Sequence, residues 1–291
     1  MSGAYVVLDG APAVVTAVDR RATADASRRA EFIGPELRVV FGDSPPHVDS
    51  SALRVDGRKL GLGSSSAVLV AAIGARELAL DHPLDEAARV RIATEAYEAH
   101  RTAQGGGSGI DIVTATHGGT LLCEVRPGGP PERLAVTLPE GLVLEVWSCP
   151  ESASTSGLLG PVRELRRLDE RRYLALTAPA RRGADEVAQA LLDRDVHALL
   201  AGLQRQTEAL ALLGEAASVP ILPPYLLALA QRRAPGSVVM QSGAGGGDIA
   251  LHLGHRPSDE SWRREAAVFG LQKLELGVEA PGVQAEPWPP V

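Results

Sequence analysis

Three glycine-rich segments constrain this chain more than any other part of its sequence. They read GLGSSS at 61–66, GGGSGID at 105–111 and SGAGGGD at 242–248. Glycine adopts backbone conformations that other residues avoid, and it lets the main chain come close to a ligand or to another segment. The fold must therefore accommodate three tight turns of the backbone, and each turn is a candidate binding loop.

The first segment stands where an apolar helical stretch begins, and this stretch runs to about residue 80. The free N–H groups and the dipole of a helix start attract an anion. Ser64, Ser65 and Ser66 add hydroxyls suited to phosphate or Mg²⁺, and Lys59 lies just upstream. An ordinary capped helix is the alternative. The segment is neither a Walker A loop, since no GK[ST] follows, nor a dinucleotide fingerprint, since the third glycine is missing.

The other two segments each end in an aspartate. Asp111 closes the second segment, and a carboxylate after a flexible loop can orient or deprotonate a hydroxyl, as an aspartate does in kinases. Capping of the next helix is the alternative role for Asp111. The third segment lies between two predicted strands, so it predicts either a hairpin or a backbone surface laid against a ligand. By itself it favours the hairpin.

The charge balance argues against a nucleic-acid-binding protein, because 36 acidic residues outweigh 29 basic ones and give a net charge of −7. Only Lys59 and Lys273 are lysines, so chemistry that needs a lysine has two candidate positions. Two cysteines, Cys123 and Cys149, predict reduced thiols and are too few for a zinc site. The start lacks a signal-peptide pattern and no apolar run is long enough to span a membrane, so a cytoplasmic protein is expected.

The hydrophobic pattern predicts an α+β protein with antiparallel or mixed sheets, because strict alternation of strands and helices is absent. Helices are expected at 64–80, at 85–103 and over most of 156–230. Strands are expected at 5–8, 13–18, 37–41, 52–55, 120–125, 134–138, 142–148, 237–240 and 249–253. A soft boundary near 140–155 predicts two domains, at 1–145 and 146–291.

Taken together, the three segments resemble the GHMP kinases in order and spacing, through GLGSSSA, AQGGGSGIDIVTATHGG and SGAGGGD. Within this superfamily the chain is most similar to phosphomevalonate kinases, which share segments like RKLGLGSSSA, AQGGGSGID and WSCPESASTSGLL. The opening AYVVLDG resembles the family's GEYAVL-type segment. The resemblance implies an N-terminal domain like ribosomal protein S5 domain 2, a C-terminal ferredoxin-like domain and a site between them.

The resemblance also implies roles for individual residues. Asp111 would orient or deprotonate the acceptor, Lys59 would offset phosphate charge, and Ser65 would contact Mg²⁺. The ATP phosphates would be cradled by Gly61, Gly63, Ser64, Ser65 and Ser66. The acceptor would be bound by Ser108, Gly109, Ser154, Thr155, Gly243, Gly245 and Gly246. Helix capping is the alternative role for Ser154 and Thr155.

His100 lies where mevalonate kinases carry a metal-binding glutamate and where phosphomevalonate kinases resemble this chain in having histidine. A histidine packed in the core is the alternative. The family's opening strand with its Pro-Gly-Lys is missing before Ala4, so that either the start is assigned too late or the chemistry has changed.

The implied function is ATP- and Mg²⁺-dependent phosphorylation of phosphomevalonate to diphosphomevalonate in isoprenoid synthesis. Two alternatives stay open. One is another GHMP activity on a mevalonate-like acid, such as mevalonate kinase or an ATP-dependent decarboxylase. The other is a non-catalytic relative that binds a ligand or a partner. A small molecule is the expected partner, with a homodimer as a further expectation and neither nucleic acid nor membrane.

Overall fold

The computed structural model describes residues 1–55, 57–151 and 155–286, and the chain forms two compact units. Unit 1 combines Met1–Val14 with Val136–Leu276, and unit 2 combines Val15–Ala135 with Gly277–Val291. Each unit therefore joins segments that lie far apart in the sequence. The predicted division into domains at 145/146 stays a prediction.

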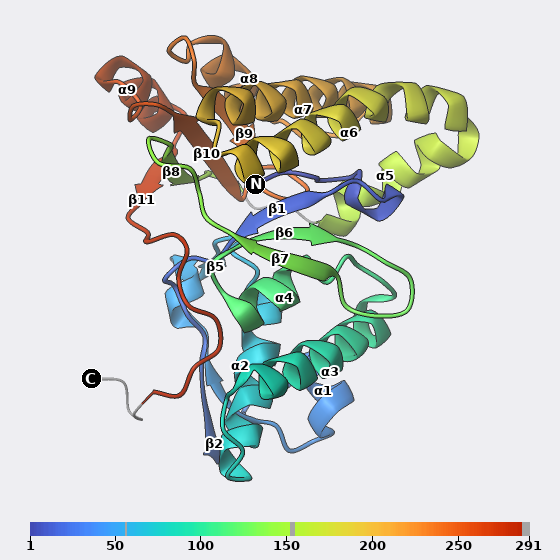
Figure 1. Ribbon diagram of the computed structural model, residues 1–291, viewed down its shortest axis with the longest axis vertical. Helices are drawn as coiled ribbons and strands as arrows, with labels where there is room; N and C mark the ends of the chain where they lie inside the picture. The colour runs from blue at the N-terminus through green and yellow to red at the C-terminus, as the bar shows by residue number, and fades with distance from the viewer. Residues whose placement is uncertain (56, 152–154, 287–291) are drawn as a thin grey trace. The chain divides into compact units, whose positions relative to one another are not determined.

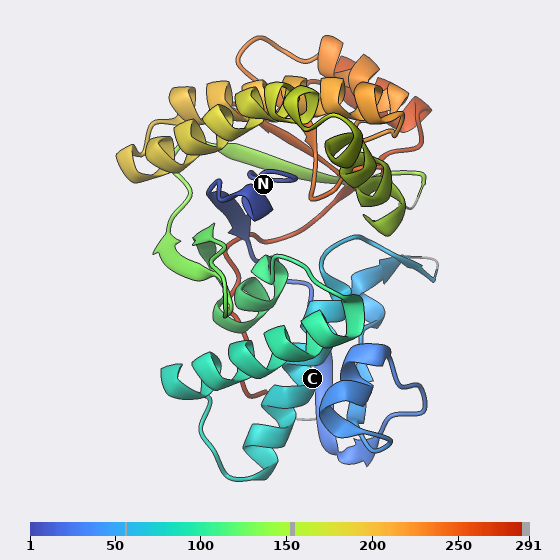
Figure 2. The same cartoon turned by 90° about the vertical axis from the view of Figure 1, so that its right-hand side faces the viewer.

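Unit 2 is built on helices that pack through their apolar faces. They are α1 (Pro35–Phe41), α2 (Ser64–Ala79), α3 (Glu86–Gln104) and α4 (Ile110–His117). Leu69 and Ile73 stand one turn apart on α2 and are fully buried, as is Ile92 on α3. Residues spaced by four share one helix face, so this stripe brings α2 and α3 side by side (Figure 2). Ile112 on α4 belongs to the same cluster.

The strands of unit 2 form short ladders. One sheet has the order β1 (Ala13–Thr16), β6 (Thr120–Glu124) and β7 (Glu132–Val136), and β1 spans the division between the units. The antiparallel pairs are β2 (Thr23–Arg29) with β3 (Pro46–Asp49), and β4 (Arg54–Val55) with β5 (Arg58–Lys59). β5 leads through the buried Leu60 into the first glycine-rich segment.

Unit 1 contains a four-stranded antiparallel sheet. Its order is β11 (Gln272–Leu274), β8 (Val143–Ser148), β10 (Ile249–Gly254) and β9 (Val238–Gln241). Trp147 pairs with both Ala250 and Lys273, and every residue of β10 is buried. Trp147 and Ala250 pack with Trp262 in one apolar cluster. Because β10 is buried along its whole length, its side chains contribute to the core of this unit.

The helices of unit 1 are α5 (Thr155–Leu168), α6 (Glu170–Asp193), α7 (Val196–Ala217), α8 (Pro224–Gln231) and α9 (Glu260–Val268). α6 and α7 run side by side for most of their length (Figure 1). They pack tightly at Gly183 and Gly202, where a Cβ on Gly183 would lie 2.6 Å from the Gly202 carbonyl oxygen. A side chain at that crossing would force the two helices apart.

The sequence predicted most of these elements. The helices expected at 64–80 and 85–103 are confirmed, as are the strands expected at 120–125, 142–148, 237–240 and 249–253. The strand expected at 37–41 is wrong, because Pro35 starts helix α1 there. The strand expected at 5–8 is also wrong, since Val7–Asp9 form a 3₁₀ turn, η1. At 52–55 a second 3₁₀ turn, η2 (Ser51–Leu53), precedes β4.

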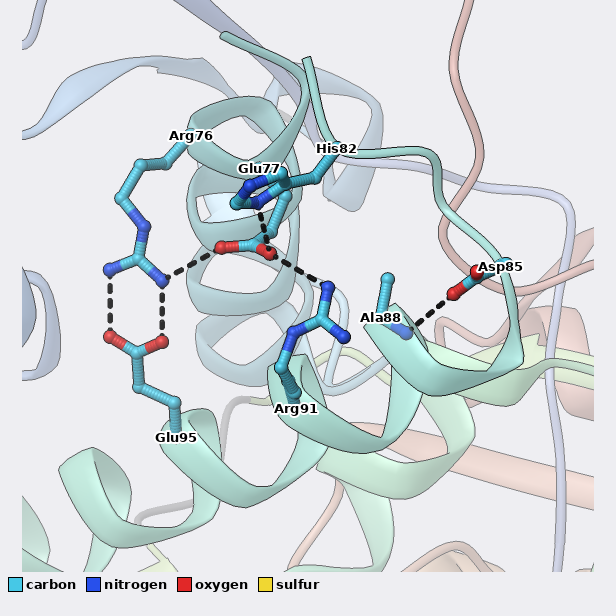
Figure 3. A network of polar contacts seen from close by, with 7 residues as sticks. All are labelled: Arg76, Glu77, His82, Asp85, Ala88, Arg91 and Glu95. Carbon is cyan, nitrogen blue, oxygen red and sulfur yellow. Dashed lines mark hydrogen bonds and ion pairs between the residues drawn. The ribbon is translucent and has the colours of Figure 1, made fainter. Parts of the chain in front are cut away.

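A polar network ties α2 to α3 (Figure 3). Glu77 on α2 is only 7% exposed, and its carboxylate lies 3.3 Å from Arg76, 3.2 Å from Arg91 and 3.2 Å from His82. Arg76 also forms two hydrogen bonds with Glu95 on α3, at 2.7 and 2.5 Å. These contacts offset the desolvation of Glu77, so that its pKa lies below the usual value.

We predict that Glu77→Ala lowers the free energy of unfolding by about 2 kcal/mol, because a buried carboxylate with three partners is lost and the helix pair loosens. Urea unfolding followed by circular dichroism measures this change. Glu164→Ala is the matched control, since Glu164 pairs with Arg167 on the surface of α5. This control should leave stability nearly unchanged. Equal effects of the two substitutions would contradict the prediction.

Candidate functional site

The first glycine-rich segment forms the start of α2. Gly61 and Gly63 both have φ = +72°, a left-handed conformation that favours glycine. Gly63 caps the helix without any side-chain hydrogen bond to the first turn. Ser65 is exposed, whereas Ser66 is 4% exposed. The first-turn N–H groups and the hydroxyl of Ser65 are thus available to an anion.

The second segment forms the start of α4. Gly109 caps this helix with φ = +72°, again without a side-chain hydrogen bond, and Asp111 lies in the first turn. A Cβ on Gly63 would lie 3.7 Å from both Cβ and Cγ of Asp111. The structure therefore brings together the predicted phosphate loop and the predicted catalytic carboxylate. Two helices start at this place in unit 2.

These two helix starts differ from those of four other helices, whereas α1 and α8 also begin without a side-chain cap. Four helices, α3, α6, α7 and α9, are capped by the side chains of Asp85, Asp169, Asp195 and Asp259. Each of these carboxylates accepts a hydrogen bond from a first-turn N–H and satisfies a group that the helix leaves open. α2 and α4 begin at glycine and have no carboxylate cap, although in α4 the hydroxyl of Ser108 accepts a 3.4 Å hydrogen bond from the N–H of Ile110. The first turn of α2, which lies beside Asp111, therefore keeps its N–H groups without a side-chain cap.

The Asp111 carboxyl keeps access to solvent, but the protein atoms around it displace much of its water. This desolvation raises the pKa of Asp111, and the positive charge of a protonated His100 partly opposes the rise. A carboxyl in such a place holds a proton more readily than a surface aspartate does. It can accept or orient a hydrogen bond from a bound hydroxyl.

His100 on α3 lies behind the second glycine segment. Its Nδ1 is 3.9 Å from Oε1 of Glu36, and a Cβ on Gly107 would lie 3.1 Å from its Nε2. Gln104 donates a 2.7 Å hydrogen bond to the same oxygen of Glu36. Glu36 is 8% exposed and was missed by the sequence analysis, because its helix was predicted as a strand from residue 37. The ring of His100 therefore lies between the loop at Gly107 and the buried carboxyl of Glu36.

The two lysines occupy different places. Lys59 is exposed at the end of β5, two residues before Gly61. Lys273 lies on β11 in unit 1, where its Nζ is 3.4 Å from the buried carboxylate of Glu145. Lys59 is thus the lysine whose place in the chain suits a phosphate at the start of α2.

The third glycine-rich segment connects the antiparallel strands β9 and β10, so the predicted hairpin is present. Gly243, Gly245, Gly246 and Gly247 all have positive φ. A Cβ on Gly245 would lie 2.1 Å from the Ile221 carbonyl oxygen, whereas nothing lies within 4 Å of one on Gly243. Part of the loop is therefore packed against the protein, and its tip at Gly243 is open.

The predicted site residues thus form two groups. The larger group belongs to unit 2 and comprises Lys59, the residues at 61–66, His100, Ser108, Gly109 and Asp111. The glycines of the third segment belong to unit 1. Thr155 is the first residue of α5 in unit 1. Ser154 lies outside the described residues.

The oxygen atoms near the start of α2 suit Mg²⁺, which prefers hard oxygen ligands and often uses one or two carboxylates with substrate phosphates. The hydroxyl of Ser65 and the carboxylate of Asp111 are such groups. Across residues 1–55, 57–151 and 155–286, no cluster of three or more His, Cys, Asp or Glu side chains could hold a metal ion. A magnesium ion here would therefore depend on phosphate oxygens as further ligands.

Comparison with known proteins gives related results at three levels. The family of GHMP kinases N terminal domains matches residues 44–119, which include the starts of α2 and α4. A phosphomevalonate kinase from Streptomyces sp. (strain CL190) is 33% identical over 235 residues. This alignment covers 70% of the chain and 59% of that relative, so the chain spans about three fifths of its length.

Solved structures share the fold. A Lin0012 protein from Listeria innocua matches with a TM-score of 0.79 and 18% identity, covering 95% of this chain and 94% of that chain. Streptococcus pneumoniae phosphomevalonate kinase in complex with phosphomevalonate and AMPPNP matches with a TM-score of 0.74 and 16% identity, covering 95% and 96%. The predicted mixed α and β fold of the GHMP kinases is thereby confirmed. In the described part of the chain, none of the helices has the length and apolar character needed to cross a membrane.

We predict that Gly109→Ala disturbs the start of α4 far more than Gly105→Ala does. The two glycines have nearly equal φ, +72° and +71°, but only a Cβ at Gly109 meets another group, 2.5 Å from Cδ2 of Tyr97. Gly105→Ala should cost about 1 kcal/mol of backbone strain, and Gly109→Ala about 2 kcal/mol more through the clash. Urea unfolding of both variants measures the difference, and equal losses would be inconsistent with this structure.

Proposed function

Because the chain belongs to the GHMP kinase superfamily of small-molecule kinases, we propose that it transfers the terminal phosphoryl group of ATP to phosphomevalonate, giving diphosphomevalonate. The observation that carries this proposal is the meeting of Gly63 and Asp111, which places an open helix start beside a carboxylate. Phosphoryl transfer needs such a pair of features, one for the donor phosphates and one for the acceptor.

The start of α2 provides the donor side. Gly61 and Gly63 let the backbone lie close to the phosphates, and the first-turn N–H groups from Ser64 to Ser66 point their dipole at the negative charge. The buried Ser66 side chain leaves the hydroxyls of Ser64 and Ser65 as the accessible ones. Ser65 would hold Mg²⁺, which neutralises charge on the transferred group. Lys59 would add a positive charge from the strand before this loop.

Asp111 provides the acceptor side. The acceptor is itself a phosphate, so proton removal matters less than orientation and charge balance. Ser108 and Gly109 precede Asp111 in the same loop and would contact the acceptor. Ser154 and Thr155, together with the loop glycines 243, 245 and 246, would complete its binding.

The 33% identity to the Streptomyces phosphomevalonate kinase supports this acceptor above others. A cytoplasmic location and a homodimer are further parts of the proposal.

We predict that the purified protein releases ADP from ATP and Mg²⁺ with phosphomevalonate. A coupled ADP-release assay should compare this acceptor with mevalonate, diphosphomevalonate, homoserine and galactose. Turnover of mevalonate alone would reassign the acceptor within the family. ADP and CO₂ release from diphosphomevalonate would indicate a decarboxylase. No turnover of any compound would overturn the proposal and favour a non-catalytic relative.

We also predict that Asp111→Asn lowers kcat/KM for phosphomevalonate by about 10²-fold or more, because the carboxylate that orients the acceptor is lost. Asp185→Asn is the matched control, since Asp185 is an exposed aspartate on α6. Steady-state kinetics measure both variants, and circular dichroism checks their folding. Unchanged turnover of a folded Asp111→Asn protein would remove this residue from the mechanism.

A further inference from the structure

Tyr5 has an unusual backbone conformation. Its φ is +66°, in the left-handed region that residues with a side chain seldom adopt. Arg194 and Ser218 share this conformation, but each of them ends a helix, where it is common. Tyr5 stands in the middle of the N-terminal segment. Strain of this kind persists where the surrounding contacts hold it, and it can mark a functional position.

The hydroxyl of Tyr5 reaches the third glycine-rich loop. It donates a 2.7 Å hydrogen bond to the carbonyl oxygen of Ala244, and both residues belong to unit 1. Burial raises the pKa of the Tyr5 hydroxyl above its ordinary value, so it keeps its proton and stays a donor.

This bond holds one end of a single peptide group. The carbonyl of Ala244 accepts from Tyr5, and the N–H at the other end, on Gly245, donates to the carbonyl of Ser242 at 3.3 Å. Glycine next to this peptide would otherwise allow it to rotate at low cost. With both ends held, rotation must break two hydrogen bonds. The carbonyl of Ala244 therefore stays turned toward Tyr5.

Tyr5 is itself anchored on both sides. Before it, the N–H of Gly3 donates to Oε1 of Gln206 on α7 at 2.8 Å. After it, the carboxylate of Asp9 accepts from Tyr173 on α6 and from Arg166 on α5, each at 2.7 Å. The segment that carries Tyr5 is thus fastened to three helices, and its hydroxyl can hold the loop.

The held loop has the character of an anion site. Successive backbone N–H groups in left-handed or turn conformations form a concave nest that binds anions. Four loop glycines have positive φ, and the tip at Gly243 is exposed with open space around it. The N–H groups of Gly245 and Gly246 already donate to the carbonyls of Ser242 and Ile221, so the donors for an anion are the N–H groups of Gly243 and Ala244 at the tip. A carbonyl oxygen turned into such a nest would repel a phosphate. The orientation of the Ala244 carbonyl therefore matters for binding.

We infer that Tyr5 is a positioning residue that keeps the Ala244 carbonyl away from the 242–248 loop tip, so that this loop offers N–H groups to a phosphate-bearing substrate. The identity of that substrate rests on the proposed function. The effect of Tyr5 on the loop and on anion binding does not, because inorganic pyrophosphate can replace the substrate as a probe.

Tyr5→Phe and Tyr173→Phe form a matched pair for the test. Each removes one hydroxyl that makes a 2.7 Å hydrogen bond to or from the same N-terminal segment. Of these two hydroxyls, the one of Tyr5 is the one that donates to the loop. Hydrogen–deuterium exchange of the peptide covering 242–248 is measured in the full chain, with and without pyrophosphate, and urea unfolding of both variants shows whether either loses overall stability.

We expect Tyr5→Phe to speed exchange in this peptide about tenfold and to raise the pyrophosphate concentration for half-protection about tenfold, as loss of one hydrogen bond would allow. Tyr173→Phe should stay near the wild-type values, because Arg166 still holds Asp9 and Gln206 still holds Gly3. In the kinase assay, Tyr5→Phe should raise the KM for the phosphorylated acceptor more than it lowers kcat. The inference is wrong if pyrophosphate does not protect the wild-type loop, or if Tyr5→Phe responds like wild type or like Tyr173→Phe. Absence of turnover in the wild-type protein would count against the proposed function alone.

Discussion

The burial of Ile112 controls the geometry on which the candidate site depends. Ile112 is fully buried in the cluster that also contains Leu69 and Ile73 of α2. Because Asp111 directly precedes Ile112 in the first turn of α4, the apolar contact that fixes α4 against α2 also fixes Asp111 against Gly63. Three large side chains buried from water contribute on the order of 5 kcal/mol to this arrangement. The position of the Asp111 carboxyl is thus set by the burial of its neighbour Ile112.

The two ends of α2 are stabilised by different physical means. Its C-terminal half carries Glu77 and Arg76, which join α3 through hydrogen bonds and ion pairs. Its start has only glycine and serine, and no side chain caps it. The C-terminal half of α2 therefore fixes the orientation of the helix against α3, while its N-terminal turn keeps its N–H groups available. Such a division lets a helix be firmly held and still present unsatisfied donors to a ligand.

Sequence reasoning succeeded where a pattern is local and failed where partners are distant. The long helices at 64–79 and 86–104 have apolar residues at helical spacing, and Asp85 is a clear capping signal. The segment LRVVF at 37–41 is rich in strand-forming residues, yet Gly34 and Pro35 start a helix there. The strand TADASRR at 23–29 is mostly polar, and only its pairing with β3 reveals it.

The same distinction applies to the site. The glycine-rich segments and Asp111 could be predicted because their residue types and their resemblance to a family are visible in the sequence. Glu36 and Tyr5 could not, because their roles arise from contacts with Gln104 and Ala244, which lie far along the chain. The residues next to Tyr5 in the sequence do not predict a left-handed backbone at this position. Such residues become visible only when the fold brings their partners to them.

The glycine caps of α2 and α4 also have a consequence for the folded state itself. A helix that begins at glycine is less stable, by a few tenths of a kcal/mol, than one that begins with Asp, Ser or Thr. Oxygen atoms of a bound phosphate can supply the missing acceptors. A ligand at this place would therefore act as part of the helices' own structure, and the protein would be more resistant to unfolding when occupied than when empty.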